Sequence, residues 1–152
     1  MMKAFEFSKI FLILSLFGFQ AFGQSKPPGN LELYALLYDG IFASFVPDMP
    51  DSLNSVTLVA LDDEHQENWI AEEQWIRNLQ AKGATIYTAD SAKIKNAVTL
   101  YYRPIVQQVE YSRAGADINR TVTVECYIKC TDPDNRVLFS RSIRESMSDR
   151  IE

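Results

Sequence analysis

The sequence predicts a two-layer α/β domain in which one mixed sheet of about five strands carries two helices on one face. A proline-free apolar segment over 31–45 is typical of a buried helix. Two short β-branched runs, over 55–61 and 84–88, flank a second helical pattern, as in a strand-helix-strand unit. The last third of the chain alternates apolar and polar residues in three longer segments, over 97–111, 120–130 and 136–143. The expected order is therefore helix, strand, helix, strand, and then a three-strand meander.

The amino-terminal residues have the pattern of a secretory signal peptide. Lys3 and Lys9 precede an apolar run of about 13 residues, shorter than the roughly 20 that a membrane-spanning helix needs. The run ends in small residues near Gly23, so residues 1–23 are predicted to be cleaved, with Gln24 as the mature amino terminus. An uncleaved anchor is the alternative. No cysteine follows the run, so a lipoprotein anchor is not expected.

The first part of the mature chain reads as a linker followed by a helix. Residues 24–29 are expected to be extended, because two prolines lie among them. Asn30 is expected to cap the helix, which would continue until Pro47. A loop rich in proline, aspartate and serine then leads to the predicted central strand over 55–61.

The only histidine, His65, lies in the acidic stretch DDEHQE over 62–67. We interpret this stretch as a helix amino terminus capped by Asp62 or Asp63. Gln66, three residues after Asp63, completes a capping-box pattern, and acids stabilise the first turn. Trp69, Trp75, Ile76 and Leu79 would form the apolar stripe of this helix, and Lys82 and Gly83 would end it. His65 as a general base remains the alternative.

Metal and catalytic motifs are missing from the sequence. One histidine does not supply the two or three that a zinc hydrolase usually needs, and DDEHQE lacks the spacing and the glycine of a calcium loop. The chain has no G-x-S-x-G elbow and no glycine-rich phosphate loop. We therefore expect no cofactor and no enzymatic activity.

The β-rich part begins with a strand over 84–88 and a polar connection over 89–95. The apolar phase of the next strand shifts at Pro104, which predicts a bulge or an edge position there. A loop around Gly115 is expected over 112–119. The turn Asp132-Pro133-Asp134-Asn135 would join the last two strands into a hairpin.

Cys126 and Cys130 lie on the same face of the predicted strand over 120–130. Residues four apart on a strand are about 13 Å from each other, whereas a disulfide requires α-carbons within about 7 Å. Both cysteines are thus expected to be free core residues, and a C-x-x-x-C metal clip lacks further ligands. Tyr127 and Lys129 would face away from the core, as solvent or interface residues. Residues 30–147 would form one domain, and 148–152 a polar, frayed tail.

The charge is distributed unevenly along the chain. Residues 25–80 hold ten acids and two bases, and residues 81–152 hold nine acids and eleven bases. A charged partner or a solvated acidic face would explain this asymmetry. The bases are scattered and the protein is net acidic, so nucleic-acid binding is not expected.

The segments VTLYYRP and RTVTVECYIKCTDPDNRVLFS resemble small periplasmic α/β domains of bacterial envelope assemblies. These include the amino-terminal domain of the Tol translocation protein B and the accessory lipoproteins of curli and lipopolysaccharide export. In these domains a strand ends in an aspartate turn, commonly Asp-x-x-Thr-Gly, and returns as an apolar strand ending near serine. Asp132 matches the aspartate, Asn135-Arg136 replaces Thr-Gly, and the return is matched by Val137, Leu138 and Ser140. The resemblance implies a non-enzymatic scaffold or adaptor and assigns no catalytic residue. Several of those domains carry a lipidated cysteine or a further domain, and neither is expected in this chain. A soluble or shortened member of such a group is therefore expected.

Two functions follow as hypotheses, and an unrecognised enzyme is a further alternative. The first is a periplasmic or secreted interaction domain, peripheral to the membrane at most, that binds an envelope protein. It would do so through its acidic front half or through a sheet edge at Tyr101, Arg103, Pro104 and Ile105. The second is a binding module for a small molecule, lipid or glycan, with Trp69, Tyr102 and Tyr111 as the ligand-facing aromatics. The sequence does not predict the oligomeric state.

Overall fold

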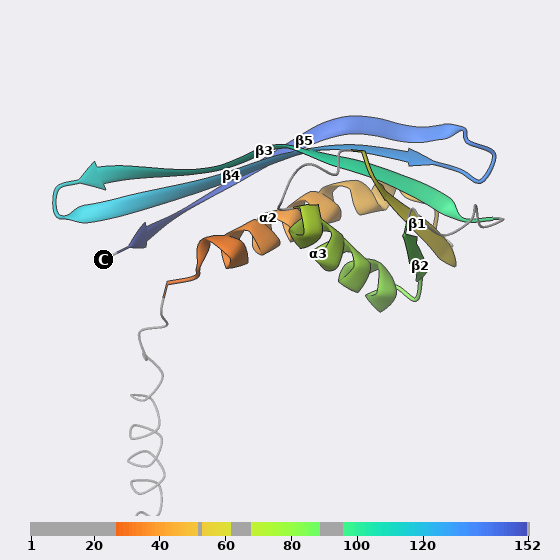
Figure 1. The fold of residues 1–152 in the computed structure, drawn as a ribbon, viewed down its shortest axis with the longest axis horizontal. Helices are drawn as coiled ribbons and strands as arrows, with labels where there is room; N and C mark the ends of the chain where they lie inside the picture. Colours follow the sequence, from red (N-terminus) through yellow and green to blue (C-terminus); the bar gives the residue numbers. More distant parts are fainter. Residues whose placement is uncertain (1–26, 52, 62–67, 89–95, 152) are drawn as a thin grey trace, which may run out of the picture.

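The computed structural model describes residues 27–51, 53–61, 68–88 and 96–151, and it confirms the predicted fold class. The helices are α2 (Asn30–Phe45), the short 3-10 helix η1 (Val46–Asp48) and α3 (Asn68–Ala81). The strands are β1 (Ser55–Ala60), β2 (Thr85–Thr88), β3 (Val98–Ala114), β4 (Asp117–Thr131) and β5 (Val137–Ile151). Figure 1 shows α2 and α3 together on one side of a single sheet.

The sheet has the strand order β2-β1-β3-β4-β5. β1 pairs in parallel with β2 and with β3, as a strand-helix-strand unit requires, and β3, β4 and β5 form an antiparallel meander. The predicted central position of β1 is therefore confirmed. The hairpin of β3 and β4 extends well past the amino-terminal end of α2 (Figure 1).

Helix α2 begins one residue earlier than a cap at Asn30 would place it. Gly29 is the N-cap, and its N–H donates to Oε2 of Glu32 at 2.7 Å. Asn30 is the first helical residue, and its side chain contacts Arg120 and Tyr111 instead of the helix backbone. The prediction of Asn30 as the cap was wrong because a glutamate at the third helical position already satisfies the free N–H of Gly29.

Helix α3 packs an aromatic cluster between the layers. Trp75 is fully buried, and its ring lies 5.2–6.1 Å, centroid to centroid, from the edge-packed rings of Tyr38, Phe45 and Tyr102. Its Nε1 donates to the Tyr38 carbonyl oxygen at 3.0 Å, so the indole N–H keeps a partner on burial. The predicted helix start in DDEHQE, with His65, lies outside the described residues.

The predicted end of α3 is confirmed. Gly83 has φ +87°, and the amides of Lys82, Gly83 and Ala84 bond to the carbonyl oxygens of Leu79 and Gln80. Glycine takes this left-handed conformation without steric cost, which is why the helix stops there.

Strand β3 contains the predicted irregularity at Pro104. The pairing with β4 shifts register between Pro104 and Val106, which is a β-bulge. The loop predicted over 112–119 is shorter in the structure: β3 continues to Ala114 and β4 begins at Asp117, with Gly115 at φ +68° in the two-residue turn. A two-residue hairpin turn needs positive φ, and Gly115 supplies it.

Strand β5 is longer than predicted. The turn before it forms as expected, with Oδ1 of Asp132 accepting the N–H groups of Asp134 and Arg136 at 2.9 and 2.8 Å. β5 then continues to Ile151, so 148–151 is strand and not a frayed tail. The polar sequence is explained by alternation, because Ser148 and Arg150 lie on the face of the sheet that no helix covers.

Candidate interaction surface on the open face of the sheet

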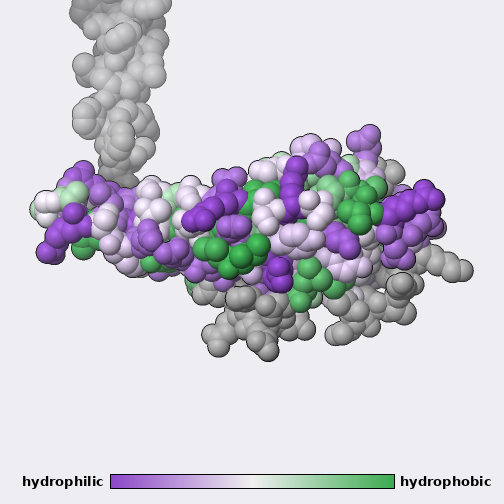
Figure 2. All heavy atoms as spheres, turned by 90° about the horizontal axis from the view of Figure 1, so that it is seen from above, coloured by the Kyte–Doolittle hydropathy of each residue, from purple (hydrophilic) through white to green (hydrophobic). Residues whose placement is uncertain are grey.

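One face of the sheet packs against α2 and α3, and the other face, here called the open face, is uncovered by any described element. Figure 2 looks onto the molecule from this side, and hydrophilic and near-neutral residues cover most of it, with hydrophobic residues in small patches. The alternation along a strand shows which side chains point to each face. In β4 the buried side chains, which face the helices, are Val122, Val124, Cys126 and Ile128. The residues between them therefore face outward.

Four residues at the centre of the open face form two cross-strand pairs, here called the open-face quartet. Tyr101 and Arg103 of β3 lie opposite Lys129 and Tyr127 of β4, respectively. Nζ of Lys129 lies 5.5 Å from the ring centroid of Tyr101, and Cζ of Arg103 lies 5.9 Å from that of Tyr127. Each cation is thus held over an aromatic face, within the distance at which a cation–π contact is attractive.

The two cations of the open-face quartet have no carboxylate partner among the described residues. The nearest ion pair on this face joins Arg144 of β5 to Glu125 of β4 at 3.6 Å. The Tyr127 hydroxyl is 2.8 Å from Oγ of Ser140, which fixes the ring against β5. The quartet therefore presents two positive charges, each over a tyrosine ring, on the uncovered face of the sheet.

This arrangement suits binding to an acidic, partly apolar surface. Lysine and arginine supply charge for carboxylates or phosphates, and tyrosine supplies contact area at low conformational cost. Within the described part of the chain, no group of three or more His, Cys, Asp or Glu side chains gathers as metal ligands would. The quartet itself contains no nucleophile paired with a base.

The four predicted edge residues occupy different positions. Tyr101 is not at an edge, because it pairs with Val59 of β1 on one side and Lys129 of β4 on the other. Pairing with β1 ends at Tyr102, so Arg103 and Ile105 lie where β3 has β4 as its only described partner. Pro104 lies there too, but its side chain is fully buried. The prediction for Tyr101 was wrong because the sequence does not show which strand β1 pairs with.

The three predicted ligand-facing aromatics do not line a common pocket. Tyr102 is buried against Trp75 in the core, because its place in the alternation puts it on the helix side. Tyr111 is 57% exposed and lies near the amino terminus of α2, where its hydroxyl accepts from Nδ2 of Asn30 at 3.3 Å. Trp69 is 52% exposed at the start of α3. The prediction that they converge was therefore wrong.

Trp69 instead lines a shallow groove along α3. The groove has a volume of about 450 Å³, and its lining consists of Trp69, Glu72, Glu73, Ile76, Arg77 and Gln80. Arg77 is paired with Glu73 at 2.9 Å across one helical turn. All the lining residues come from one helix, so no second described element closes the groove.

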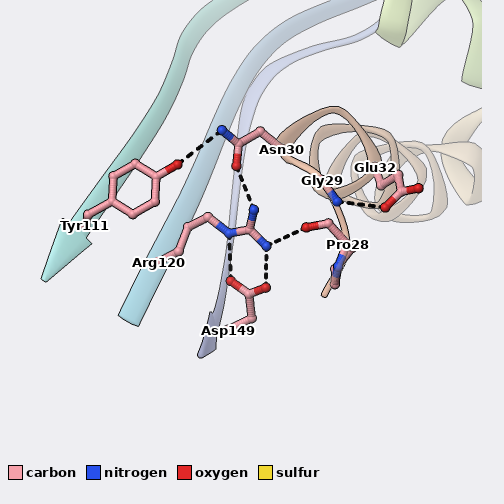
Figure 3. Close-up of polar contacts among 7 residues, drawn as sticks. All are labelled: Pro28, Gly29, Asn30, Glu32, Tyr111, Arg120 and Asp149. Carbon is pink, nitrogen blue, oxygen red and sulfur yellow. Dashed lines mark hydrogen bonds and ion pairs between the residues drawn. The ribbon is translucent and has the colours of Figure 1, made fainter. Parts of the chain in front are cut away.

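A buried arginine joins the far half of the sheet to α2. Nε of Arg120 donates to Asp149 of β5 at 2.8 Å, and a second, shorter bond makes the pair bidentate. Its remaining bonds reach Oδ1 of Asn30 and the Pro28 carbonyl oxygen, both at 2.7 Å (Figure 3). The Arg120 side chain is 6% exposed, and its Nε, Nη1 and Nη2 atoms all donate to groups within the protein. Arg120 is therefore a structural contact and not a ligand-binding residue.

The same contacts shift two pKa values. The hydrogen bonds from Arg120 lower the pKa of the Asp149 carboxyl, and the carboxylate in turn raises the pKa of Arg120. Arg120 was not identified from the sequence. The sequence does indicate its position, since Arg120 is two residues before Val122 and so lies on the same face of β4 as the buried Val122 and Val124. A buried arginine requires a carboxylate partner.

Comparisons with known proteins assign no family. No protein-family model matches the sequence, and no curated protein matches it. Similar solved structures include lipoprotein GNA1162 from Neisseria meningitidis, at 13% identity and a TM-score of 0.45 over 62% of this chain and 83% of that chain. Another is the hypothetical protein CT253 from Chlamydia trachomatis, at 9% identity and a TM-score of 0.42 over 64% and 74% of the two chains. Among the described residues, no helix has the length and apolar character needed to cross a membrane.

Proposed function

We propose that this protein is an exported, non-enzymatic interaction domain of the bacterial cell envelope that binds an acidic surface of a protein partner through the open-face quartet. The observation that carries the proposal is the pair of cations, Arg103 and Lys129, held over tyrosine rings on an uncovered face without carboxylate partners. The signal-peptide pattern in residues 1–23 supports export.

Physical reasoning favours a protein partner over a small ligand at this face. No quartet residue lines the α3 groove, and the quartet lies on the uncovered face of a sheet, whereas small ligands bind mainly in concave sites. Protein interfaces are enriched in tyrosine and arginine, which supply three of the four quartet residues, the fourth being Lys129. Because the attraction is between charges near the surface, binding should weaken as salt rises.

The test compares the tagged native protein with a variant that lacks both cations, Arg103→Ala with Lys129→Ala. Each protein is expressed in its native envelope, crosslinked in situ and purified, and the co-purifying proteins are identified by mass spectrometry. We expect one stoichiometric partner with the native protein, and affinity for that partner should fall about fivefold for each cation removed, or about 1 kcal/mol each.

A matched control removes a positive charge elsewhere. Arg77→Ala changes an exposed arginine on α3, away from the sheet, and should leave binding unchanged. Equal retention of the partner by the double variant and the native protein would contradict the proposal.

A second candidate function is binding of a small molecule, lipid or glycan in the α3 groove, which the exposed Trp69 favours. A ligand that binds only the folded state raises the melting temperature, so a thermal-shift screen with envelope lipids and glycans tests it. A stabilising compound should lose its effect in Trp69→Ala.

A further inference from the structure

Strand β5 forms a long, free edge of the sheet. Its residues pair with β4 on one side, and no described residue pairs with the other side. Its 15 residues exceed the usual strand length of about five or six. An edge of this length exposes a row of unpaired backbone N–H and C=O groups that can pair with another strand.

The sequence of β5 is complementary to itself in one antiparallel register. With a two-fold axis through Ile143 and perpendicular to the sheet, residue pairs are symmetric about position 143. Arg141 then lies opposite Glu145 of the second copy, and Phe139 lies opposite Met147, each pair occurring twice on the helix side. On the open face this register places no two like charges of β5 opposite each other; Arg150 falls opposite Arg136, which lies just before the strand.

Neighbouring registers fit less well. An axis at Arg141, at Arg144 or at Glu145 places that charged residue opposite its own copy, which is destabilising. An axis at Ser142 places Glu145 opposite Phe139. Among axes between Arg141 and Glu145, the one at Ile143 pairs opposite charges without opposing like charges within β5.

The charges that this register needs are available. No basic side chain of the described residues pairs with Glu145, and Glu145 is only partly buried. Arg141 pairs with Asp48 and donates to the Ser44 carbonyl oxygen, but its side chain is still 40% exposed. A guanidinium has five donors, so it can bind a second carboxylate.

Helix α2 exposes an apolar residue beside the same edge. Ser44 contacts Arg141, and a Cβ placed on Gly40 would lie 4.0 Å from Cγ of Glu145. Leu36 is one turn before Gly40 on the same face of the helix, and it is 52% exposed. Pairing of two β5 edges would bring a second copy next to this leucine.

We propose that two copies of this protein associate through their β5 edges, antiparallel and symmetric about Ile143. The result is a continuous ten-stranded sheet with all helices on one face and two open-face quartets on the other. Self-association does not depend on the quartet having a partner, so this inference and the proposed function can fail separately.

Cysteine crosslinking tests the register of the two β5 strands directly. In this register Ser142 and its copy are diagonal neighbours, with Cβ atoms about 7–8 Å apart. Ser148 and its copy are ten residues apart along the strands, or roughly 33 Å. Ser142→Cys should therefore form covalent dimers with a short bismaleimide, and Ser148→Cys, on the same strand and face, should not. The native protein is the second control, because both of its cysteines are buried.

Charge reversal tests the ion pair. By sedimentation velocity over a concentration series, Glu145→Arg should raise the dimer dissociation constant at least tenfold, because Arg141 would face another arginine. The swapped variant, Arg141→Glu with Glu145→Arg, should restore association in an Asp48→Asn background, since Asp48 pairs with Arg141 and would otherwise repel the new glutamate. Glu110→Arg on β3 is the matched control and should have no effect, since Glu110 is exposed and β4 separates β3 from the free edge of β5.

Three outcomes would overturn the inference. The first is a native protein that stays monomeric with no crosslink at position 142. The second is a dimer that crosslinks at position 148 instead, which would show a different register. The third is a dimer that crosslinks at neither position, which would place the contact on another surface.

Discussion

Asp149→Asn tests the contact between Arg120 and the far end of β5. The native carboxylate accepts two charge-assisted hydrogen bonds from an arginine whose side chain is 6% exposed. Such bonds contribute about 1.5–3 kcal/mol each to stability. Asparagine keeps one acceptor oxygen but loses the charge and places an amide N–H₂ next to the guanidinium.

The expected cost follows from these contacts. Loss of one hydrogen bond and weakening of the other would lower the free energy of unfolding by about 2–4 kcal/mol in a fully buried site. Asp149 is 21% exposed, and solvent screening reduces the effect, so we expect the free energy of unfolding to fall by about 2 kcal/mol. Urea unfolding followed by tryptophan fluorescence measures it, since Trp75 is buried in the core.

Asp117→Asn is the matched control. Asp117 pairs with Arg150 near the same end of the sheet, but the arginine side chain is 63% exposed. Surface ion pairs contribute little, so this variant should lose only about 0–0.5 kcal/mol. Equal losses in the two variants, or a loss below about 0.5 kcal/mol for Asp149→Asn, would refute the reasoning.

Three further predictions concern pH, thiol reactivity and helix stability. The lowered pKa of Asp149 contributes stability that is present above the ordinary aspartate pKa and is lost as pH falls through the lower folded-state pKa; acid unfolding should therefore begin at higher pH in a variant without Arg120. Burial raises the pKa of Cys126 and Cys130 to about 12, so neither thiol should react with a thiol reagent at neutral pH until the protein unfolds; fast labelling of the native protein would contradict this. Gly40→Ala should raise the free energy of unfolding by about 0.5–1 kcal/mol, because the added Cβ has room and glycine is a poor helix former; a loss in urea unfolding would show that the position needs glycine.

Local signals in the sequence predicted most of the fold. Gly83 and the Asp132 turn act within a few residues, and both were placed correctly because the left-handed φ of glycine and the side-chain bonds of aspartate depend little on the rest of the chain. The bulge at Pro104 was likewise visible as a shift in apolar phase. Cys126 and Cys130 followed from alternation alone.

The candidate site depended on contacts that the sequence does not show. Tyr127 and Lys129 were expected to face outward, but their pairing with Arg103 and Tyr101 is a consequence of the register between β3 and β4. The bulge changes that register by one residue, so a pattern read from either strand alone cannot give it. Tyr102 was predicted to face a ligand but is buried. The helices determine which face of the sheet is buried, and the sequence of the strand does not show where they pack.

The polar end of β5 shows a second limit. Ser148 to Arg150 has the composition of a frayed terminus, yet it lies in a strand because Asp149 pairs with Arg120, 29 residues earlier in the chain. Asn30, 90 residues before Arg120, completes that cluster. Contacts over such distances follow from the topology and not from local propensity.

Site-specific photocrosslinking in the native envelope tests the proposed function most directly. A photoreactive amino acid replaces Tyr127 on the open face or, in a second variant, Trp69 in the α3 groove. The proposed interaction predicts a discrete crosslinked protein at position 127 that becomes weaker when Arg103 and Lys129 are changed to alanine, with none at position 69. A crosslinked protein at position 69 alone, or at neither position, would contradict binding through the open-face quartet.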